Sequence, residues 1–295
     1  MGSPPDEQQA KQRQRWKESE DMGRISRGWQ LAKMSLRVIR KDKEILIFPV
    51  LSGLISLVIL GSFIGGIFFT GVFMNASDET LSWTFYAFFI AFYFVSFFIS
   101  IFFNAAVIGC ATIRMNGGDP TVADGFRIAG QNIGRILLWA IFTATVGLII
   151  RAIQQRVGFI GKLILGAIGV IWTLATYFVV PVLIYEKLGP WGAVKRSASV
   201  FKNTWGEMIA GNLGLGAVFF LLALLGLLPI ILGVVVGSLA SIVAGIAIAI
   251  VYWLILAVVL SAAQSVLVAA LYRYATTGKV SEEFHEMSFA KPFAA

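Results

Sequence analysis

Long runs of apolar residues without a charged side chain dominate the chain. Residues 45–77 and 80–113 contain no Asp, Glu, Lys or Arg. Because about 20 apolar residues suffice for a helix to cross a bilayer, each run predicts one transmembrane helix. The polar pair Asp78–Glu79 between them predicts the turn of a helical hairpin.

Two shorter apolar runs predict a second hairpin. Residues 136–150 are flanked by Arg135 and Arg151, whose side chains can extend from the ends of a short span towards the membrane surfaces. Residues 163–185 contain no basic or acidic residue and are long enough to cross by themselves. The two runs therefore add a third and a fourth span.

The last apolar run is 65 residues long, from residue 208 to 272, and admits two interpretations. Pro229 and the stretch Gly233-Val-Val-Val-Gly237-Ser238 supply break points, because proline removes a helical hydrogen bond. We expect two helices with an irregular or re-entrant segment near residues 226–240. The sequence then predicts an all-α, polytopic membrane bundle of about six transmembrane helices, whereas three short helices in this run would make seven.

An apolar stripe with spacings of three and four residues recurs directly before each hairpin. Such a stripe predicts a helix that lies on a membrane surface, with one apolar and one basic face. The three stripes are Ile25, Trp29, Ala32, Leu36 and Ile39; Val122, Phe126, Ala129, Ile133 and Ile136; and Val194, Ala198, Phe201, Trp205 and Met208. We expect these helices to lie near the membrane plane, with Trp29, Phe126 and Trp205 turned towards the apolar phase.

The recurrence of these elements predicts an internal repeat within one membrane domain, residues 24–275. Each unit would be a cytoplasmic-side surface helix followed by a hairpin, and the units are about residues 24–114, 120–187 and 190–275. Residues 1–23 are polar and predicted to be a disordered tail, and residues 276–295 form a second tail. Unrelated amphipathic connectors would produce the same stripes without a duplication.

The basic residues are distributed unequally between the two sides of this topology. With six spans, 21 of the 24 Lys and Arg residues fall on the side of the termini, and the other side holds only Arg151, Arg156 and Lys162. Lys and Arg collect on the cytoplasmic side of membrane proteins. We therefore expect a multi-pass protein of the cell membrane, plasma or inner, with both termini in the cytoplasm.

The composition argues against catalysis. Only 14% of the residues are charged and 58% are hydrophobic, against about 25% charge in soluble domains. The one cysteine, Cys110, lies in an apolar run, and the one histidine, His285, lies in the C-terminal tail. No HExxH, Cys-x-x-Cys or GxSxG motif is present. We expect no enzyme activity, no cofactor, no metal and no nucleic-acid partner, since no compact basic domain carries the net charge.

Basic side chains of the surface helices are candidate ligands for lipid headgroups. An anionic leaflet attracts each Lys or Arg near its surface by about 1 kcal/mol. The candidates are Arg37, Arg40, Lys195, Arg196 and Lys202. The sequence therefore predicts a non-catalytic protein that organises anionic phospholipids or serves as an accessory or scaffold subunit, with other membrane subunits or itself as partner. Alternatively, these charges only set the topology during insertion.

Two amides within the spans are candidates for a polar path. Asn104 and Gln264 each precede a glycine on the cytoplasmic side by 14 residues, which predicts related depths. If the two amides faced a cavity, they would line the path of a channel or transporter between the hairpins. This is the alternative function that the sequence leaves open. Packed inside the bundle, each would hydrogen-bond across helices. Arg114 and Arg273, at the ends of the same helices, are predicted to anchor there by snorkelling.

Two stretches resemble known families. The stretch GRISRGWQLAK from residue 23, followed by Arg40-Lys-Asp-Lys-Glu44 and Phe48-Pro49, resembles the opening of a prokaryotic family of integral membrane proteins of unknown function, over most of residues 23–275. The segment IYEKLGPWGAVKRS, residues 184–197, more distantly resembles the multi-span membrane domain found with some glycerophosphodiester phosphodiesterases. Neither resemblance implies an activity for this chain, because the phosphodiesterase activity belongs to a separate catalytic domain.

Overall fold

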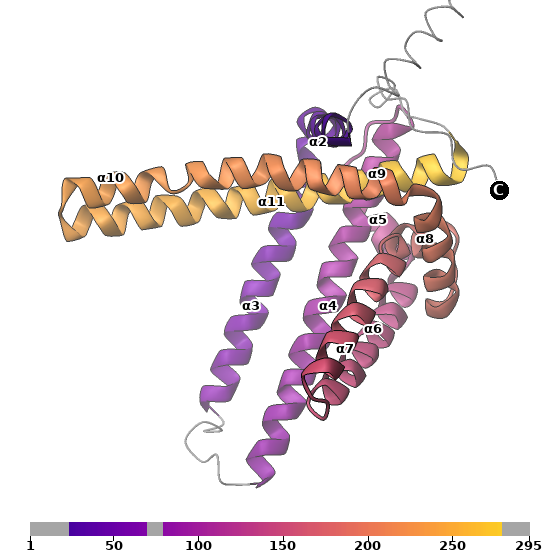
Figure 1. Cartoon of the computed structure of the whole chain (residues 1–295), viewed down its shortest axis with the longest axis horizontal. Coiled ribbons are helices and arrows are strands. Elements are labelled where there is room, and N and C mark those ends of the chain that lie inside the picture. The colour runs from indigo at the N-terminus through magenta and orange to yellow at the C-terminus, as the bar shows by residue number, and fades with distance from the viewer. Residues whose placement is uncertain (1–23, 70–78, 279–295) are drawn as a thin grey trace, which may run out of the picture. The chain divides into compact units, whose positions relative to one another are not determined.

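The computed structural model describes residues 24–69 and 79–278, and all the regular structure within these ranges is helical (Figure 1). The predicted all-α fold is therefore confirmed. The N-terminal tail, most of residues 276–295 and the turn residue Asp78 lie outside the described residues. The described chain forms two compact units.

Within the described residues, six helical stretches are long and apolar enough to cross a membrane, which agrees with the predicted count. They are Lys43–Phe69, Tyr86–Met115, Ile133–Gln154, Phe159–Tyr185, Pro190–Val236 and Leu239–Thr277. The long charge-free run thus contributes to two of these spans rather than three, although the first of the two consists of two successive helices. These helices give the chain the architecture of a multi-pass membrane protein.

The first unit comprises the described parts of Met1–Leu46, Ala111–Asp119 and Lys202–Ala295. It holds α2 (Arg24–Lys41), the 3-10 helix η1 (Lys43–Leu46), the end of α4 (Glu79–Met115), most of α9 (Pro190–Leu225), α10 (Leu228–Val236) and α11 (Leu239–Thr277). Within it, α10 runs back along α11, and α2 and η1 also pack against α11 (Figure 1). The buried residues of α11 between Ala262 and Tyr272 contribute to its core.

The second unit comprises the described residues of Ile47–Cys110 and Pro120–Phe201. It holds α3 (Ile47–Phe69), most of α4, α5 (Val122–Gln131), α6 (Ile133–Gln154), α7 (Phe159–Ala175), α8 (Val179–Tyr185) and the start of α9. Helix α6 packs against α5, α7 and α8. Phe48 of α3 is fully buried and meets Phe126 of α5 edge to face, with 5.5 Å between ring centroids.

The span predicted over residues 163–185 is two helical pieces rather than one. Pro181 lies in the first turn of α8, where its missing N–H is tolerated but where it prevents α7 from continuing regularly. At the break, the N–H of Phe178 donates to the buried hydroxyl of Ser197 at 2.9 Å. A second break, at Gly226–Leu227, separates α9 from α10, so the irregular piece predicted near residues 226–240 is short.

The three segments predicted as surface helices are helical, but they differ from the prediction in detail. The third is not separate, since α9 continues from it into the next apolar run without a break. Its buried positions include Ser197 and Thr204, whereas Trp205 of the predicted stripe is 49% exposed. Phe126 is also exposed, and the side chain of Trp29 lies outside the described part. The orientation of these helices relative to a membrane stays a prediction.

A residue in the left-handed region follows the second helix of each predicted repeat unit. These residues are Gly117 (φ 82°), Lys187 (φ 56°) and Gly278 (φ 65°). After α4, the N–H of Gly117 donates to Arg114 at 2.9 Å and that of Gly118 donates to Ile113 at 3.0 Å, the Schellman pattern that ends many helices. The shared ending agrees with an internal repeat, which itself stays a prediction.

Candidate functional site

The outer side of α2 carries a group of exposed basic residues. This group, the α2 basic face, consists of Lys33, Arg37, Arg40 and Lys41. Spacings of three and four residues place them on neighbouring turns of the helix. Met34, Val38 and Ile39 are buried on the other side. The predicted headgroup ligands Arg37 and Arg40 therefore lie on a solvent-facing strip of a helix that is fixed by its apolar side.

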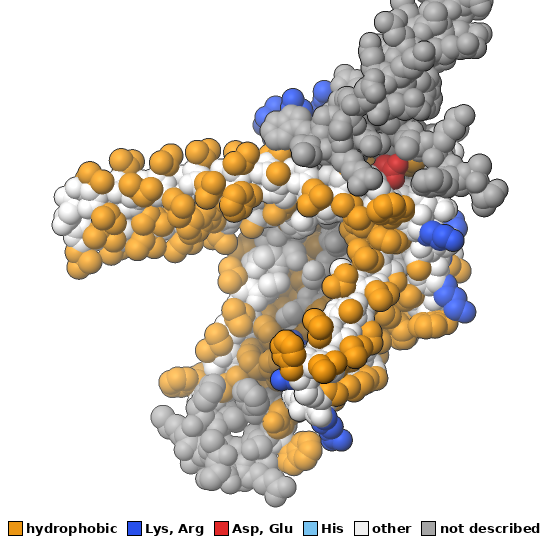
Figure 2. All heavy atoms as spheres, in the orientation of Figure 1, with side chains coloured by type: hydrophobic (Ala, Val, Ile, Leu, Met, Phe, Trp, Pro, Cys, Tyr) orange, Lys and Arg blue, Asp and Glu red, His pale blue; other side chains and the backbone are white. Residues whose placement is uncertain are grey.

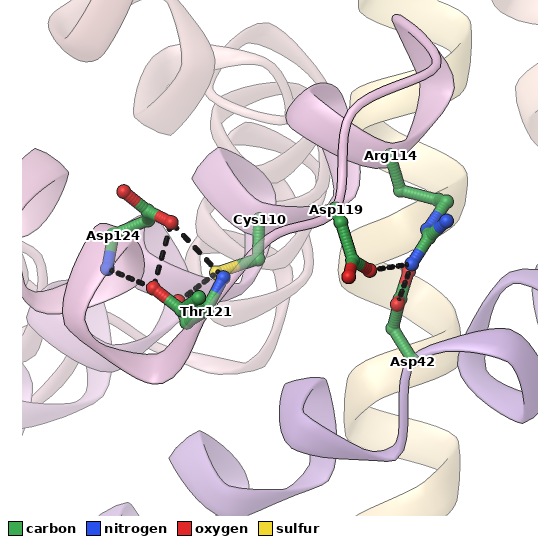
Figure 3. Close-up of polar contacts among 6 residues, drawn as sticks. All are labelled: Asp42, Cys110, Arg114, Asp119, Thr121 and Asp124. Carbon is green, nitrogen blue, oxygen red and sulfur yellow. Dashed lines mark hydrogen bonds and ion pairs between the residues drawn. The ribbon is translucent and has the colours of Figure 1, made fainter.

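A buried carboxylate follows the α2 basic face. Asp42 is only 5% exposed, and its N–H donates to the carbonyl of Val38 at 3.1 Å. Arg114, near the end of α4, donates from Nε and Nη2 to the two oxygens of the Asp42 carboxylate (Figure 3). A bidentate pair of this kind has a defined planar geometry. The pair thereby holds the end of α2 to the end of α4 within the first unit.

Two further contacts complete this cluster of the first unit. Arg114 also pairs with the exposed Asp119 (Figure 3). Arg273, near the end of α11, donates to the carbonyl oxygen of Met115, the last residue of α4. A cation is favourable there because the final carbonyls of a helix lack helical partners and carry partial negative charge. Protein groups thus bind both Arg114 and Arg273, and the prediction that these side chains anchor the helix ends at the membrane surface stays a prediction.

Sequence reasoning missed Asp42, and one signal could have found it. In the run Arg40-Lys-Asp-Lys-Glu44, the aspartate is surrounded by charges and has the composition of an exposed loop. However, Val38, Asp42 and Ile45 follow one another at spacings of four and three, and all three are buried. Asp42 thus occupies a position of the apolar stripe, where a carboxylate requires a partner.

In the second unit, α5 begins at a capping box that the sequence prediction did not include. The Thr121 hydroxyl accepts from the N–H of Asp124 at 3.2 Å, and the Asp124 carboxylate accepts from the hydroxyl and the N–H of Thr121 at 2.7 and 3.0 Å (Figure 3). These hydrogen bonds hold the pKa of Asp124 below its ordinary value, and the bond with the Thr121 side chain has the largest effect. The buried thiol of Cys110 donates to the Thr121 carbonyl at 3.6 Å, so Cys110 serves the same turn.

The start of α9 places its three candidate ligands in different environments. The Nε of Arg196 donates to both oxygens of Glu186 at 2.8 and 2.9 Å, so a protein carboxylate already neutralises this charge. Lys195 is exposed, and its ammonium lies 5.8 Å from the ring centroid of Trp191, within the range of a cation–π contact. Lys202 is exposed as well. Lys195 and Lys202 are thus better headgroup candidates than Arg196.

The two amides of the spans are both exposed, although most of their neighbours are buried. A role for Asn104 and Gln264, whether in a polar path or in bonds across helices, stays a prediction. The left-handed glycines after α4 and α11 are Gly117 and Gly278, which lie 13 and 14 residues beyond the two amides. The two amides therefore lie at similar distances from their helix ends. The offset of one residue, however, rotates one side chain by about 100° about the helix axis relative to the other.

Two of the described ion pairs join residues that are far apart along the chain or at separate helix ends. Asp42 with Arg114 and Glu186 with Arg196 are mutually neutral. Among the residues that the structure describes, no three His, Cys, Asp or Glu side chains lie close enough together to hold a metal ion. The α2 basic face gathers four exposed basic residues on one helix, so it is the described feature best suited to a ligand, and that ligand would be an anion.

Comparison with known families gives one match. Residues 83–282, about two thirds of the chain, match the model of a family described as a family of unknown function (DUF6159). The match supports the predicted resemblance to uncharacterised membrane proteins, but it does not include residues 23–49, on which that resemblance was based. A search of curated proteins finds no match. The resemblance to the membrane domain of glycerophosphodiester phosphodiesterases receives no support.

Proposed function

The chain belongs to the family of unknown function DUF6159, and for this member we propose a non-catalytic role as an integral membrane protein that binds anionic lipid headgroups through the α2 basic face. The observation that carries the proposal is the exposure of four basic side chains on a helix whose opposite side is buried within its unit. Lys195 and Lys202 are candidates for a second point of headgroup contact.

The position of the α2 basic face along the chain supports this role. The first apolar span begins at Lys43, only two residues after Lys41. A helix that ends directly before a span lies close to the headgroups of one leaflet, where each basic residue gains about 1 kcal/mol from anionic lipid. Several such residues would collect anionic lipid around the helical bundle. We propose the cytoplasmic leaflet of the cell membrane, because the Lys and Arg bias places this side there.

The native lipid content of the purified protein tests the proposal. The variant Arg37→Gln/Arg40→Gln removes two charges from the α2 basic face and leaves the Asp42–Arg114 pair intact. If each charge contributes about 1 kcal/mol, the variant should bind phosphatidylglycerol roughly 30-fold more weakly than the parent. Native mass spectrometry after exchange into phosphatidylcholine nanodiscs with a fixed phosphatidylglycerol content measures this difference. Added salt should reduce binding by the parent, because exposed charges are screened.

The matched control removes the same charge from the other side of the predicted topology. Arg156→Gln/Lys162→Gln alters two exposed basic residues next to the turn between α6 and α7. We expect this control to retain the phosphatidylglycerol of the parent. Equal binding by all three proteins would show that the basic face only sets topology. Equal loss in both variants would show a response to net charge rather than a site, and would equally overturn the proposal.

A further inference from the structure

The turn between α10 and α11 differs in chemistry from the turn between α6 and α7. Three basic residues, Arg151, Arg156 and Lys162, lie at or near the α6–α7 turn. By contrast, no charged residue occurs between Met208 and Tyr272, and the α10–α11 turn itself reads VVVGSLAS. Figure 2 shows hydrophobic side chains along the visible face of α10 and the adjoining part of α11, without an acidic or basic side chain.

The polar groups of this turn are satisfied from within the hairpin. Gly237 takes the left-handed conformation (φ 78°), and its N–H donates to Val234 at 3.0 Å. The Ser238 hydroxyl accepts from the N–H of Ser241 at 3.0 Å, and the Ser241 hydroxyl donates to the carbonyl of Gly233 at 2.8 Å. In hydrocarbon, where water cannot serve backbone groups, irregular structure requires such internal partners.

The break between α9 and α10 is satisfied in the same manner. The Tyr252 hydroxyl donates to the carbonyl of Leu222 at 2.7 Å, and the indole N–H of Trp253 donates to that of Ala223 at 3.0 Å. Both donors belong to α11, the second helix of the hairpin. Side chains of α11 therefore bind the two carbonyls that water would bind at a membrane surface. The hairpin therefore supplies hydrogen-bond partners at both of its irregular points, the turn and the break.

Glycine brings the two helices of the hairpin into direct backbone contact. A Cβ on Gly233 would lie 2.5 Å from the carbonyl oxygen of Ser241, and a Cβ on Gly245 would lie 2.3 Å from that of Pro229. Side chains on the outer surface remain open: Val235 is 77% exposed and Leu239 is 79% exposed. The tip of the hairpin, around Gly237 and Ser238, is thus a closely packed pair of helices whose outside is mainly apolar and carries no charged residue.

The lengths of the charge-free parts favour one environment for this surface. The charge-free parts on the two sides of the turn, residues 208–236 and 239–272, correspond to roughly 45 Å and 50 Å of helix, against a hydrocarbon thickness of about 30 Å. Placed along the membrane normal, they would push Val235 and Leu239 through the far surface into water. An inclined hairpin keeps all of these side chains in hydrocarbon.

We propose that the turn at Gly237–Ser238 stays inside the hydrocarbon of the bilayer, so that lipid acyl chains are the occupants of the apolar surface of the α10–α11 tip. The segments between the other two pairs of apolar runs carry charged residues, for which water is the favourable environment. The third hairpin then enters and leaves the bilayer on the same side without exposing its turn on the other. This inference does not depend on headgroup binding by α2.

Cysteine accessibility tests the inference in the full-length chain. In a Cys110→Ala background, which removes the one native thiol, single cysteines are introduced as Leu239→Cys, Val235→Cys and, as the matched control, Gln155→Cys in the α6–α7 turn. All three positions are exposed on the protein itself, so the bilayer alone distinguishes them. Maleimides react with the thiolate, and a thiol forms its thiolate only where water is present. In membranes that are opened so that the reagent reaches both sides, both tip cysteines should therefore react with a membrane-impermeant maleimide at least about tenfold more slowly than the control. All three should react fully after unfolding in detergent.

A direct probe of the acyl chains completes the test. A bimane fluorophore attached at Leu239→Cys in detergent, followed by reconstitution, should be quenched by lipids brominated along their acyl chains, and the same label at Gln155→Cys should not. Maleimide labelling of either tip cysteine at the rate of the control, from either side, would overturn the inference. Slow labelling without bromolipid quenching would also overturn it, since a second copy of the chain would then be the cover.

Discussion

The hydroxyl of Tyr252 donates a hydrogen bond of 2.7 Å to the carbonyl oxygen of Leu222, 30 residues earlier in the chain. In a regular helix the N–H of Gly226 would serve that carbonyl, but it donates instead to Ala223 at 3.0 Å. Pro229, which lacks an N–H, begins the next helix and prevents the regular pattern from continuing. Tyr252 therefore replaces a backbone donor that the break removes.

The first prediction concerns this replacement. Tyr252→Phe removes only the hydroxyl and leaves the Leu222 carbonyl without its donor in an apolar environment, so we expect a loss of about 1 kcal/mol in the free energy of unfolding. Trp253→Phe should act in the same direction, whereas the control Trp83→Phe, at an exposed ring, should have little effect. Thermal unfolding of the detergent-solubilised protein measures all three. An unchanged midpoint for Tyr252→Phe would show that the carbonyl finds another donor.

The buried Asp42 should matter more than the exposed Asp119, although both bind Arg114. Asp42→Asn removes the buried negative charge and leaves the guanidinium without its main partner, so we expect a loss of about 2 kcal/mol or more in stability. Asp119→Asn should cost less than about 1 kcal/mol, as is usual for exposed pairs. The same thermal assay compares the two. In a double-mutant cycle with Arg114→Gln, the effect of Asp42→Asn should shrink, and full additivity would contradict the pairing.

Gly125 should tolerate no side chain. A Cβ there would lie 2.2 Å from Cζ of the fully buried Phe48 and 2.9 Å from Sγ of Cys110. We expect Gly125→Ala to lower the free energy of unfolding by about 1–3 kcal/mol through overpacking. Gly130→Ala in the same helix is the matched control, since nothing lies within 4 Å of its Cβ position. The control should be neutral or slightly stabilising, because alanine is the better helix former. The reverse order of the two variants would contradict this packing.

Ser197 should be required for the break between α7 and α8. Its hydroxyl is fully buried and accepts the N–H of Phe178. Ser197→Ala removes this acceptor, and we expect a loss of about 1–3 kcal/mol in stability. The neighbouring Ser199 is exposed, so Ser199→Ala serves as the control and should unfold at the temperature of the parent. Equal midpoints for the two variants would refute a structural role for the Ser197 hydroxyl.

The capping box of α5 should make a pH-dependent contribution to stability. Since the pKa of Asp124 is lowered in the folded protein from the ordinary value of 3.8, its contribution is fully present above pH 3.8 and is lost as the pH falls through the lower folded-state pKa. The difference in unfolding midpoint between the parent and Asp124→Ala should therefore shrink below pH 3.8. A difference that stays constant from pH 7 to pH 3 would show that the carboxylate form is not preferred in the cap.

Part of the candidate site could be predicted from the sequence, because it depends on the periodicity of a single helix. Arg37 and Arg40 were expected on an exposed basic face, and they lie there. Arg196 was grouped with them, although it pairs with Glu186, ten residues earlier. A stripe shows which positions of one helix share a side, but it does not show which neighbouring residue folds back against them.

The sequence by itself determined the all-α class and the six apolar helical stretches of the residues that the structure describes. Uninterrupted apolar length makes a helix suitable for a membrane, and that length can be counted along the chain. Only the tertiary structure decided that Asp42 is buried against Arg114, 72 residues away, and that Tyr252 completes the break at Leu222. Both contacts satisfy a polar group that the apolar surroundings would otherwise penalise. Which residue supplies the partner depends on how separate helices pack, and that information is not contained in the periodicity of either helix.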